Sequence, residues 1–382
     1  MKKIILSTVA VAAMTTMATA SSEVDMLKRQ IDALYNKIDA METKQAQAEE
    51  AATKAKAATL SSKAPVIEMS GTHYLGFVNS DKTTGAGVKT TDNQFETRRN
   101  YFQVKGFFAE NPKDYVRLTL DATYSGAGTN EGYSDVIVKY AYLYLDNVLP
   151  YTGVEIGQAH RPWIDYEEHH GWWYRSISKV LVEDDNAAHF TNSADLGLDF
   201  KTKTENFSSE LGIFNGEGYH GTLPTENKLS FEYRLTAHLL GTGMNKEKAD
   251  ETYANVSFFG QNNKDYKGAG EDFNWYGVHG VYNNEDFLLA AQYVKASKGG
   301  SSYEGKGWSV NGEYRFMKDW NSIARYDNFK LDSGIEKKRT IAGIAYEYNS
   351  NVELIANLQK TDVSGTSGFK DNALMLTACI EW

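Results

Sequence analysis

The chain has 382 residues and a formal net charge of −10, with 24 Tyr, 17 Phe and 7 Trp but only 5 Pro and one Cys. A lone cysteine excludes an intramolecular disulfide framework, and the sequence shows neither a phosphate-binding glycine loop nor a basic, aromatic-rich nucleic-acid-binding stripe. Abundant strand formers and few strand breakers indicate a protein built mainly of β-strands.

The first twenty residues have the build of a bacterial secretory signal peptide. Two lysines at positions 2 and 3 precede an apolar stretch over residues 4–13, and Ala-Thr-Ala at 18–20 supplies a cleavage site. The alternative, a retained transmembrane helix, needs roughly 20 apolar residues, which neither this stretch nor any later segment reaches. We expect the mature protein to start near Ser21 and any membrane residence to depend on strands.

Residues 21–63 carry a heptad pattern. Apolar or small side chains follow a 3-4 spacing at Val24, Leu27, Ile31, Leu34, Ile38, Met41, Gln45, Ala48, Ala52 and Ala55. A helix over residues 22–59 would be roughly 57 Å long at 1.5 Å per residue. The pattern predicts a short coiled coil that joins copies of the chain, followed by a linker; the alternative is an amphipathic helix packed on its own chain.

From about residue 66 onward the chain alternates apolar and polar side chains. In the last segment Leu374, Leu376 and Ala378 fall on one face and Met375 and Thr377 on the other, so one face can meet lipid and the other water. A soluble sandwich would alternate too, but here the outward set is apolar and aromatic in strand after strand. The predicted strands cover residues 66–80, 94–110, 114–125, 134–148, 151–161, 191–203, 207–218, 228–241, 251–262, 272–285, 286–298, 305–317, 320–332, 337–349, 352–363 and 371–382.

Sixteen is an even count, as in single-chain bacterial outer-membrane barrels. The fold expected for residues 64–382 is therefore an all-β, sixteen-stranded antiparallel transmembrane β-barrel. Tight connections follow even-numbered strands and longer ones mostly follow odd-numbered strands, which predicts short periplasmic turns, long external loops and periplasmic termini. The connection at residues 241–250 departs from this rule because it is long where a tight turn is expected.

The longest connection, from Pro162 to about Phe190, follows the fifth strand. Loops of about 30 residues are unusual unless functional, and a sixteen-stranded barrel is wide enough for a loop to fold inward and narrow its lumen. The alternative is a surface loop shaped by aromatic packing. This constriction hypothesis sets Arg161, Arg175 and Lys179 against Asp165, Glu167, Glu168, Glu183, Asp184 and Asp185.

The same region resembles a known family, the phosphate-selective porins O and P. The similar motifs are Arg98-Arg99 followed by Gly106, then Tyr115 to Asp121, Gly157-Gln158, Arg161-Pro162-Trp163, Glu167-Glu168 and Tyr174-Arg175. The general pattern extends over most of the chain from Val66, and the motifs lie within residues 95–175. The resemblance implies a sixteen-stranded trimeric channel whose basic lumen attracts anions. Because the heptads formally favour two strands, oligomer number stays open.

The charges of the barrel are mixed. The first 63 residues hold 9 basic and 7 acidic residues, which leaves 31 basic and 43 acidic residues and a net charge of −12 for the remainder. Selectivity depends on the lumen rather than on this total. Alternation predicts inward-pointing Arg99, Lys105, Arg117, Arg234, Arg315 and Arg325, together with Asp121, Glu232, Glu313, Asp327 and Glu353. For each, the alternative to a solute-binding role is a charge pair that holds the barrel's shape.

Other constellations are weak. His169-His170 beside Glu167-Glu168 has no spaced third metal ligand, and His238 shares a lumenal face with Ser230 but has no hydrolase-like partner. We therefore expect neither enzymatic activity nor a metal or cofactor.

Two functional classes follow from these patterns. One is an outer-membrane porin for passive diffusion of small hydrophilic solutes, with a modest preference for anions such as phosphate or other oxyanions. The other is a structural envelope protein whose periplasmic coiled coil tethers the outer membrane. The expected partners are outer-membrane lipid, small anionic solutes and further copies of the chain. The expected pore residues are Arg99, Lys105, Arg117, Arg161, Asp165, Glu167, Glu168, Arg175, Arg234, Arg315 and Arg325.

Overall fold

The chain divides into two compact units, Met1–Ala64 and Pro65–Trp382. A computed structural model describes residues 31, 34–38, 41, 44, 65–124, 134–216, 218–219, 229–264, 272–299, 302–365 and 367–382. The few described residues of the first unit are helical. The predicted signal peptide and most of the predicted coiled coil lie outside the described residues. Among the described residues, no helix combines the length and apolar character that crossing a bilayer requires.

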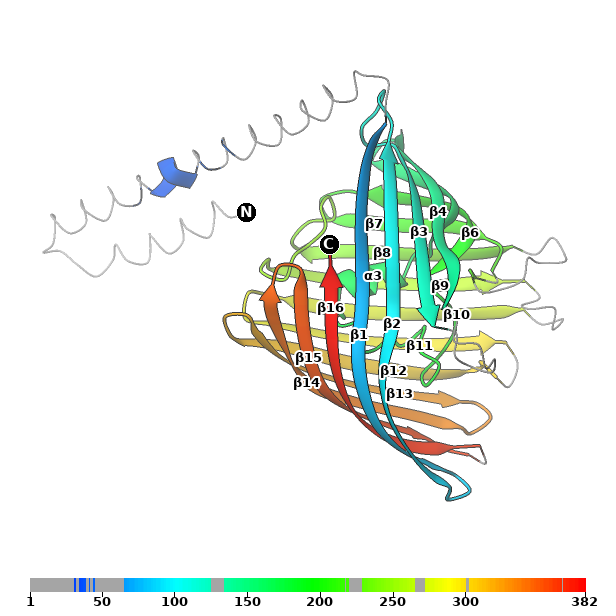
Figure 1. Cartoon of the computed structure of the whole chain (residues 1–382). Coiled ribbons are helices and arrows are strands. Elements are labelled where there is room, and N and C mark those ends of the chain that lie inside the picture. Colours follow the sequence, from blue (N-terminus) through cyan, green and yellow to red (C-terminus); the bar gives the residue numbers. More distant parts are fainter. Residues whose placement is uncertain are drawn as a thin grey trace, which may run out of the picture. The chain divides into compact units, whose positions relative to one another are not determined.

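The second unit is a closed antiparallel barrel of sixteen strands, each paired with its neighbours in sequence (Figure 1). The strands are β1 Val66–Thr84, β2 Lys89–Phe107, β3 Tyr115–Tyr124, β4 Ser134–Leu149, β5 Thr152–His160, β6 Ala194–Lys203, β7 Phe207–Phe214, β8 Ser230–Leu240, β9 Tyr253–Asn263, β10 Phe273–Asn283, β11 Phe287–Lys298, β12 Gly305–Met317, β13 Trp320–Leu331, β14 Glu336–Asn349, β15 Val352–Val363 and β16 Phe369–Glu381. A short helix, α3, spans Ile164–His170 in the β5–β6 loop. The predicted strand count and antiparallel closure are confirmed.

The barrel closes where β1 pairs with β16. Gly71 and Trp382 exchange backbone hydrogen bonds of 2.9 and 3.1 Å, and the Trp382 indole nitrogen donates to His73 Nε2 at 3.0 Å. The start of β1 and the end of β16 therefore lie at one end, which we call the turn end because most connections there are short. The opposite end is the loop end.

The alternation of faces agrees with the sequence. On β8, Phe231 and Leu235 are exposed on the outside, whereas Ser230, Glu232 and Arg234 are buried inside. The same split recurs on β12 and β16. The predicted inward position of Asp121, Glu232, Glu313, Asp327 and Arg325 matches their burial.

The first hairpin is longer than predicted. Residues 81–93 are mostly polar, which is typical of a loop, yet β1 runs to Thr84 and β2 starts at Lys89. Cross-strand hydrogen bonds hold this extension, including Thr91 Oγ1 to Asp81 at 2.6 Å. The turn itself uses Gly87, whose φ of 81° suits glycine.

Two β-bulges shift the alternation, one on β2 and one on β4. Opposite Tyr74 and Leu75 of β1 stand Arg99 and Thr97 of β2, so Arg98 has no paired residue. Likewise, Lys139 of β4 is the extra residue in its pairing with β3. Each bulge adds a basic side chain to the inner face of the β1–β4 wall.

Candidate functional site

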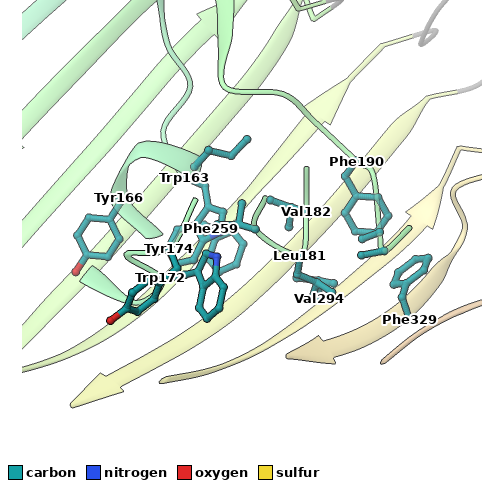
Figure 2. Packing of buried hydrophobic residues seen from close by; sticks show 14 of the residues in the cluster. Trp163, Tyr166, Trp172, Tyr174, Leu181, Val182, Phe190, Phe259, Val294 and Phe329 are labelled. Atoms are coloured by element: carbon teal, nitrogen blue, oxygen red, sulfur yellow. The ribbon is translucent and has the colours of Figure 1, made fainter. Parts of the chain in front are cut away.

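The loop between β5 and β6, residues 161–193, lies inside the barrel against one side of its wall. Trp163 stacks on Phe259 of β9, with ring centroids 3.5 Å apart and planes 3° from parallel (Figure 2). Near the other end of the loop, Phe190 packs against Trp275 and Phe329, with ring centroids 5.3 and 5.4 Å apart. One buried cluster joins the loop's Trp172, Tyr174, Ile177, Val180, Leu181 and Val182 to inward residues of β9, β10, β11, β13, β14 and β15.

Helix α3 starts this loop and is anchored through Glu167. The Trp163 indole nitrogen donates to Glu167 Oε2 at 2.8 Å, and Gln292 of β11 donates to the other carboxylate oxygen. Burial raises the pKa of Glu167 to about 7, and the charge of Arg325 and the two hydrogen bonds only partly oppose this effect. The helix ends at Gly171, whose backbone N–H donates to the Glu167 carbonyl at 2.8 Å.

Most of the loop's charges are neutralised. Arg161 donates from Nε to Glu232 Oε2 at 2.8 Å, and Arg175 donates from Nη2 to Glu183 Oε1 at 2.8 Å. Arg175 also pairs with Glu168. Burial acts to raise the pKa of Glu183, but the Arg175 charge and hydrogen bond outweigh it and hold that pKa below its usual range. We expected Arg161 and Arg175 to act as pore cations, but each is compensated by a buried carboxylate, Glu232 of β8 for Arg161 and Glu183 of the loop for Arg175.

The arginines on the inner face of β8, β12 and β13 are compensated in the same way. Arg234 pairs with Glu210 at 2.9 Å, Arg315 with Glu313 at 2.7 Å, and Arg325 with Asp327 at 2.8 Å. These residues are on the inner face, as predicted, but each is compensated by a neighbouring carboxylate. Arg234 and Arg325 also donate to loop carbonyls, those of Pro162 and Lys179. Arg315 donates instead to the carbonyl of Asn284 in the β10–β11 turn.

The inner face of β2, β3 and β4 is different. It carries Arg99, Lys105, Arg117 and Lys139, which we call the basic column. Each cation lies over tyrosine rings. The cation-to-centroid distances are 4.4 Å for Arg99 over Tyr101, 5.2 Å for Lys105 over Tyr115, 4.6 Å for Arg117 over Tyr140, and 5.6 and 4.1 Å for Lys139 over Tyr140 and Tyr219.

The hydrogen-bond partners of the basic column are neutral groups. Arg99 donates to the Tyr74 hydroxyl at 3.2 Å, Arg117 donates to Thr119 Oγ1 at 3.1 Å, and Lys139 donates to the Tyr219 hydroxyl at 3.0 Å. Within the described residues, none of the four cations has a carboxylate within 4.0 Å. A ring attracts a cation through its quadrupole but carries no net charge, so the rings do not cancel the charges of the column.

Sequence reasoning identified three members of the column and missed Lys139 and the neighbouring Arg98. Arg98 donates to the loop carbonyl of Ser176 at 2.8 Å and to Thr377 Oγ1 at 2.9 Å. Both residues sit at bulges, where strict alternation fails. The adjacent pair Arg98-Arg99 was visible in the sequence, but nothing there indicated that both side chains point inward.

On the inner faces of β7, β8 and β9, a chain of hydrogen bonds leads from Arg234 to Glu247. Arg234 donates to Ser208 Oγ at 3.0 Å, and Ser208 and His238 Nε2 are 2.9 Å apart. His238 Nδ1 is 2.9 Å from Asn255 Oδ1, and Asn255 Nδ2 donates to Glu247 at 2.8 Å. The predicted long connection after β8 thus folds into the barrel through Glu247. His238 contacts Ser208 rather than Ser230. All five side chains in this chain of hydrogen bonds are buried, so Ser208 has a structural role.

The described ranges contain no group of three or more His, Cys, Asp or Glu residues placed to hold a metal ion. His169 and His170 instead direct Nδ1 to backbone carbonyls of α3, at 2.6 Å from Asp165 O and 2.7 Å from Tyr166 O.

Sixteen strands closed in sequence order around an inward-folded loop define a barrel of the porin type. Comparison with solved structures agrees. An anion-selective porin from Comamonas acidovorans is 11% identical, with a TM-score of 0.61 over 83% of this chain and 100% of that one. The outer membrane channel DcaP of Acinetobacter baumannii is 12% identical, with a TM-score of 0.57 over 84% and 98%.

A third similar structure is a loop L8 deletion mutant of OmpT, an outer membrane protein of Vibrio cholerae, at 13% identity and a TM-score of 0.56 over 84% of this chain and 100% of that one. At these identities the likeness concerns the fold. No protein-family model and no curated protein sequence matches the chain.

Proposed function

We propose that this protein is an outer-membrane diffusion channel for small hydrophilic solutes, with a modest preference for anions. The observation that carries the proposal is the contrast between two parts of the inner wall. Arginines of β8, β12 and β13 pair with carboxylates, whereas the basic column of β2, β3 and β4 stacks on tyrosines and stays uncompensated.

The loop strengthens this contrast. Its apolar residues pack against β9 to β11 and β13 to β15. On β2 and β3, Arg99, Lys105 and Arg117 keep part of their surface exposed for a passing solute, whereas Lys139 of β4 is buried behind them. A charge beside a narrow, low-dielectric passage acts more strongly than one in bulk water. The net charge of −12 is a total over the whole barrel, whereas selectivity depends on the charges that line the passage.

The side chains of the column also suggest which anions would pass. Arg99 and Arg117 carry planar guanidinium groups, which match the geometry of phosphate and carboxylate oxygens better than that of a spherical halide. This supports oxyanions as the favoured solutes. The resemblance to phosphate-selective porins points the same way, as does the likeness to a structure described as an anion-selective porin.

The proposal includes a homo-oligomer in the outer membrane, with the N-terminal segment in the periplasm. One of the similar structures is a trimer form of OmpT, 13% identical with a TM-score of 0.56, and we favour a trimer here. The tethering function expected as an alternative rests on residues 22–59 and stays a prediction. Loss of envelope integrity with intact conductance after deletion of those residues would support it.

The proposal is tested by the reversal potential of single channels under a salt gradient. Arg99→Ala with Arg117→Ala should move it toward cations, because two uncompensated charges leave the passage. The matched control removes a whole pair, Arg315→Ala with Glu313→Ala, and should leave selectivity nearly unchanged. A pore indifferent to the first change, or equally sensitive to the second, would contradict the proposal.

A further inference from the structure

His160, the last residue of β5, lies between the basic column and the loop. Its Nε2 atom is 3.2 Å from Arg117 Nη1 and 3.9 Å from Asp165 Oδ1 of α3. Its Nδ1 atom is 3.2 Å from Glu155 Oε2. The ring also packs on Tyr140, with centroids 4.2 Å apart. One nitrogen thus has a cation and an anion within reach.

The contact with Arg117 requires a neutral imidazole. An arginine can only donate, so Nε2 must present a lone pair to it, and the ring proton is then on Nδ1, where it is donated to Glu155. In this state His160 holds the Arg117 guanidinium over Tyr140 without cancelling its charge. No carboxylate takes that role among the described residues.

Protonation reverses the preference of Nε2. In the imidazolium form both nitrogens carry hydrogens, so Nε2 no longer accepts from Arg117 and instead repels it. Asp165 is the carboxylate on the other side of the same nitrogen, and its side chain keeps 46% of its surface exposed, which leaves it room to approach. Protonation therefore moves the Nε2 contact of His160 from Arg117 to Asp165.

We propose that His160 is a positioning residue that makes the anion preference of the channel depend on pH. When neutral, it holds Arg117 in the column. When protonated, it pairs with Asp165 and so frees Arg117 toward the passage, and it adds a positive charge to the wall. The inference rests on the proposed anion-conducting column, of which Arg117 is a member.

Charged groups of both signs surround His160, which is itself buried, and burial opposes the charged form of an imidazole. Arg117 of β3 opposes protonation, whereas Glu155 of β5 and Asp165 of the loop favour it. Lys201 of β6 lies 3.1 Å from Glu155 Oε1 and keeps that carboxylate ionised, and His169 lies 3.5 Å from Asp165. Two phenols of β4, Tyr140 and Tyr142, complete the described surroundings. An ordinary histidine changes charge near pH 6.5.

The test compares anion-to-cation permeability ratios at pH 8 and pH 5, using potassium chloride gradients across planar bilayers. The wild-type ratio should rise about twofold on acidification, the order expected for one added unit charge in a partly hydrated passage. His160→Gln should lose most of this rise, because its amide oxygen can still accept from Arg117 but does not titrate. His189→Gln is the matched control, since His189 is half exposed and pairs with Asp185 at 2.7 Å.

A second variant makes the result independent of how well His160→Gln folds. Asp165→Asn removes the carboxylate that receives the protonated ring, so it should also reduce the rise. An unchanged rise in both variants, or a wild-type ratio that does not vary with pH, overturns the inference. A cation-preferring pore whose ratio still shifts through His160 would refute the proposed function alone, whereas an anion-preferring pore without the shift would refute this inference alone.

Discussion

Arg99 and Arg175 show how partners decide what an arginine contributes. Arg175 lies close enough to Arg99 for their charges to interact, yet it is held between Glu168 and Glu183. Arg99 stands over Tyr74 and Tyr101. Arg175 therefore contributes to the structure of the loop, because its charge is compensated nearby. Arg99 projects a field into the lumen, because its neighbours stabilise it without compensating it.

For single residues, the sequence predicted which face of the wall a side chain occupies better than which group it contacts. Alternation placed Arg99, Arg117, Arg234 and Arg325 on the inner face correctly. Whether each one meets a carboxylate or a ring depends on neighbours from other strands and from the loop, and these come together only through barrel closure. The Arg161–Glu232 pair, for instance, joins residues 71 positions apart.

Glu167 gives a pH-dependent prediction. Its pKa is about 7 in the folded chain against roughly 4.3 in an unfolded one. Stability from the protonated form is therefore fully present below about pH 4.3 and is lost as pH rises through 7, by roughly 4 kcal/mol in all. Glu167→Gln should remove this loss, since Gln292 Oε1 is buried without a partner in the described part of the chain and can accept from the new amide.

Urea unfolding of refolded barrels at pH 5 and pH 8 measures this effect. The wild type should be less stable at pH 8 than at pH 5 by more than Glu167→Gln is. Equal losses in the two proteins would mean that Glu167 is not the titrating anchor of α3.

At the scale of elements, strand number, order and facing could be predicted because period-two alternation is local. Bulges could not, because the extra residue is defined by the partner strand: Arg98 and Lys139 look ordinary until β1 and β3 are in register. The extended first hairpin was also missed, since its mostly polar residues 81–93 resemble a loop while their hydrogen bonds are cross-strand.

The loop's attachment to β14 separates two neighbouring acids that the sequence could not distinguish. In the sequence, Asp184 and Asp185 are simply two adjacent acidic residues of the loop. In the structure Asp184 is buried and pairs with Arg339, which also pairs with Asp327 at 2.7 Å, whereas the Asp185 side chain is 72% exposed. The two positions therefore form a matched comparison of anchor and surface.

Asp184→Asn should loosen the loop, because it weakens the charge-assisted contact to Arg339 at a buried site, by roughly 1–3 kcal/mol. The expected result is a noisier single-channel current and faster proteolysis within residues 175–190. Asp185→Asn should behave as the wild type does. If both variants are equally quiet and resistant, Asp184 does not fasten the loop.

At the scale of the whole barrel, the interior is asymmetric and the outer face is not uniformly suited to lipid. His73 and Asn100, on the outside of β1 and β2, are hydrogen-bonded to each other at 3.1 Å. Next to them is a groove of about 1530 Å³, lined by side chains of β1, β2 and β13 to β16. Polar groups are costly against hydrocarbon, so we expect another copy of the chain to cover this face.

If the barrel wall supplies the contact between copies, the N-terminal segment is not needed for assembly. A protein lacking residues 22–59 should still run as an oligomer in mild detergent, because the barrel wall supplies the contact, whereas Leu354→Arg in the groove should weaken it. Leu289→Arg, on the outside of β11, provides the control for a charge on the outer face. A truncated barrel that runs as a monomer would assign assembly to the coiled coil instead.

The most direct test of the account is the reversal potential of the wild-type channel in a salt gradient, measured at about 0.1 M and again at about 1 M. Screening shortens from about 10 Å to about 3 Å between these concentrations. An uncompensated basic column predicts anion preference at low salt that weakens at high salt. A channel that prefers cations at low salt, or whose preference does not change with salt, would contradict it.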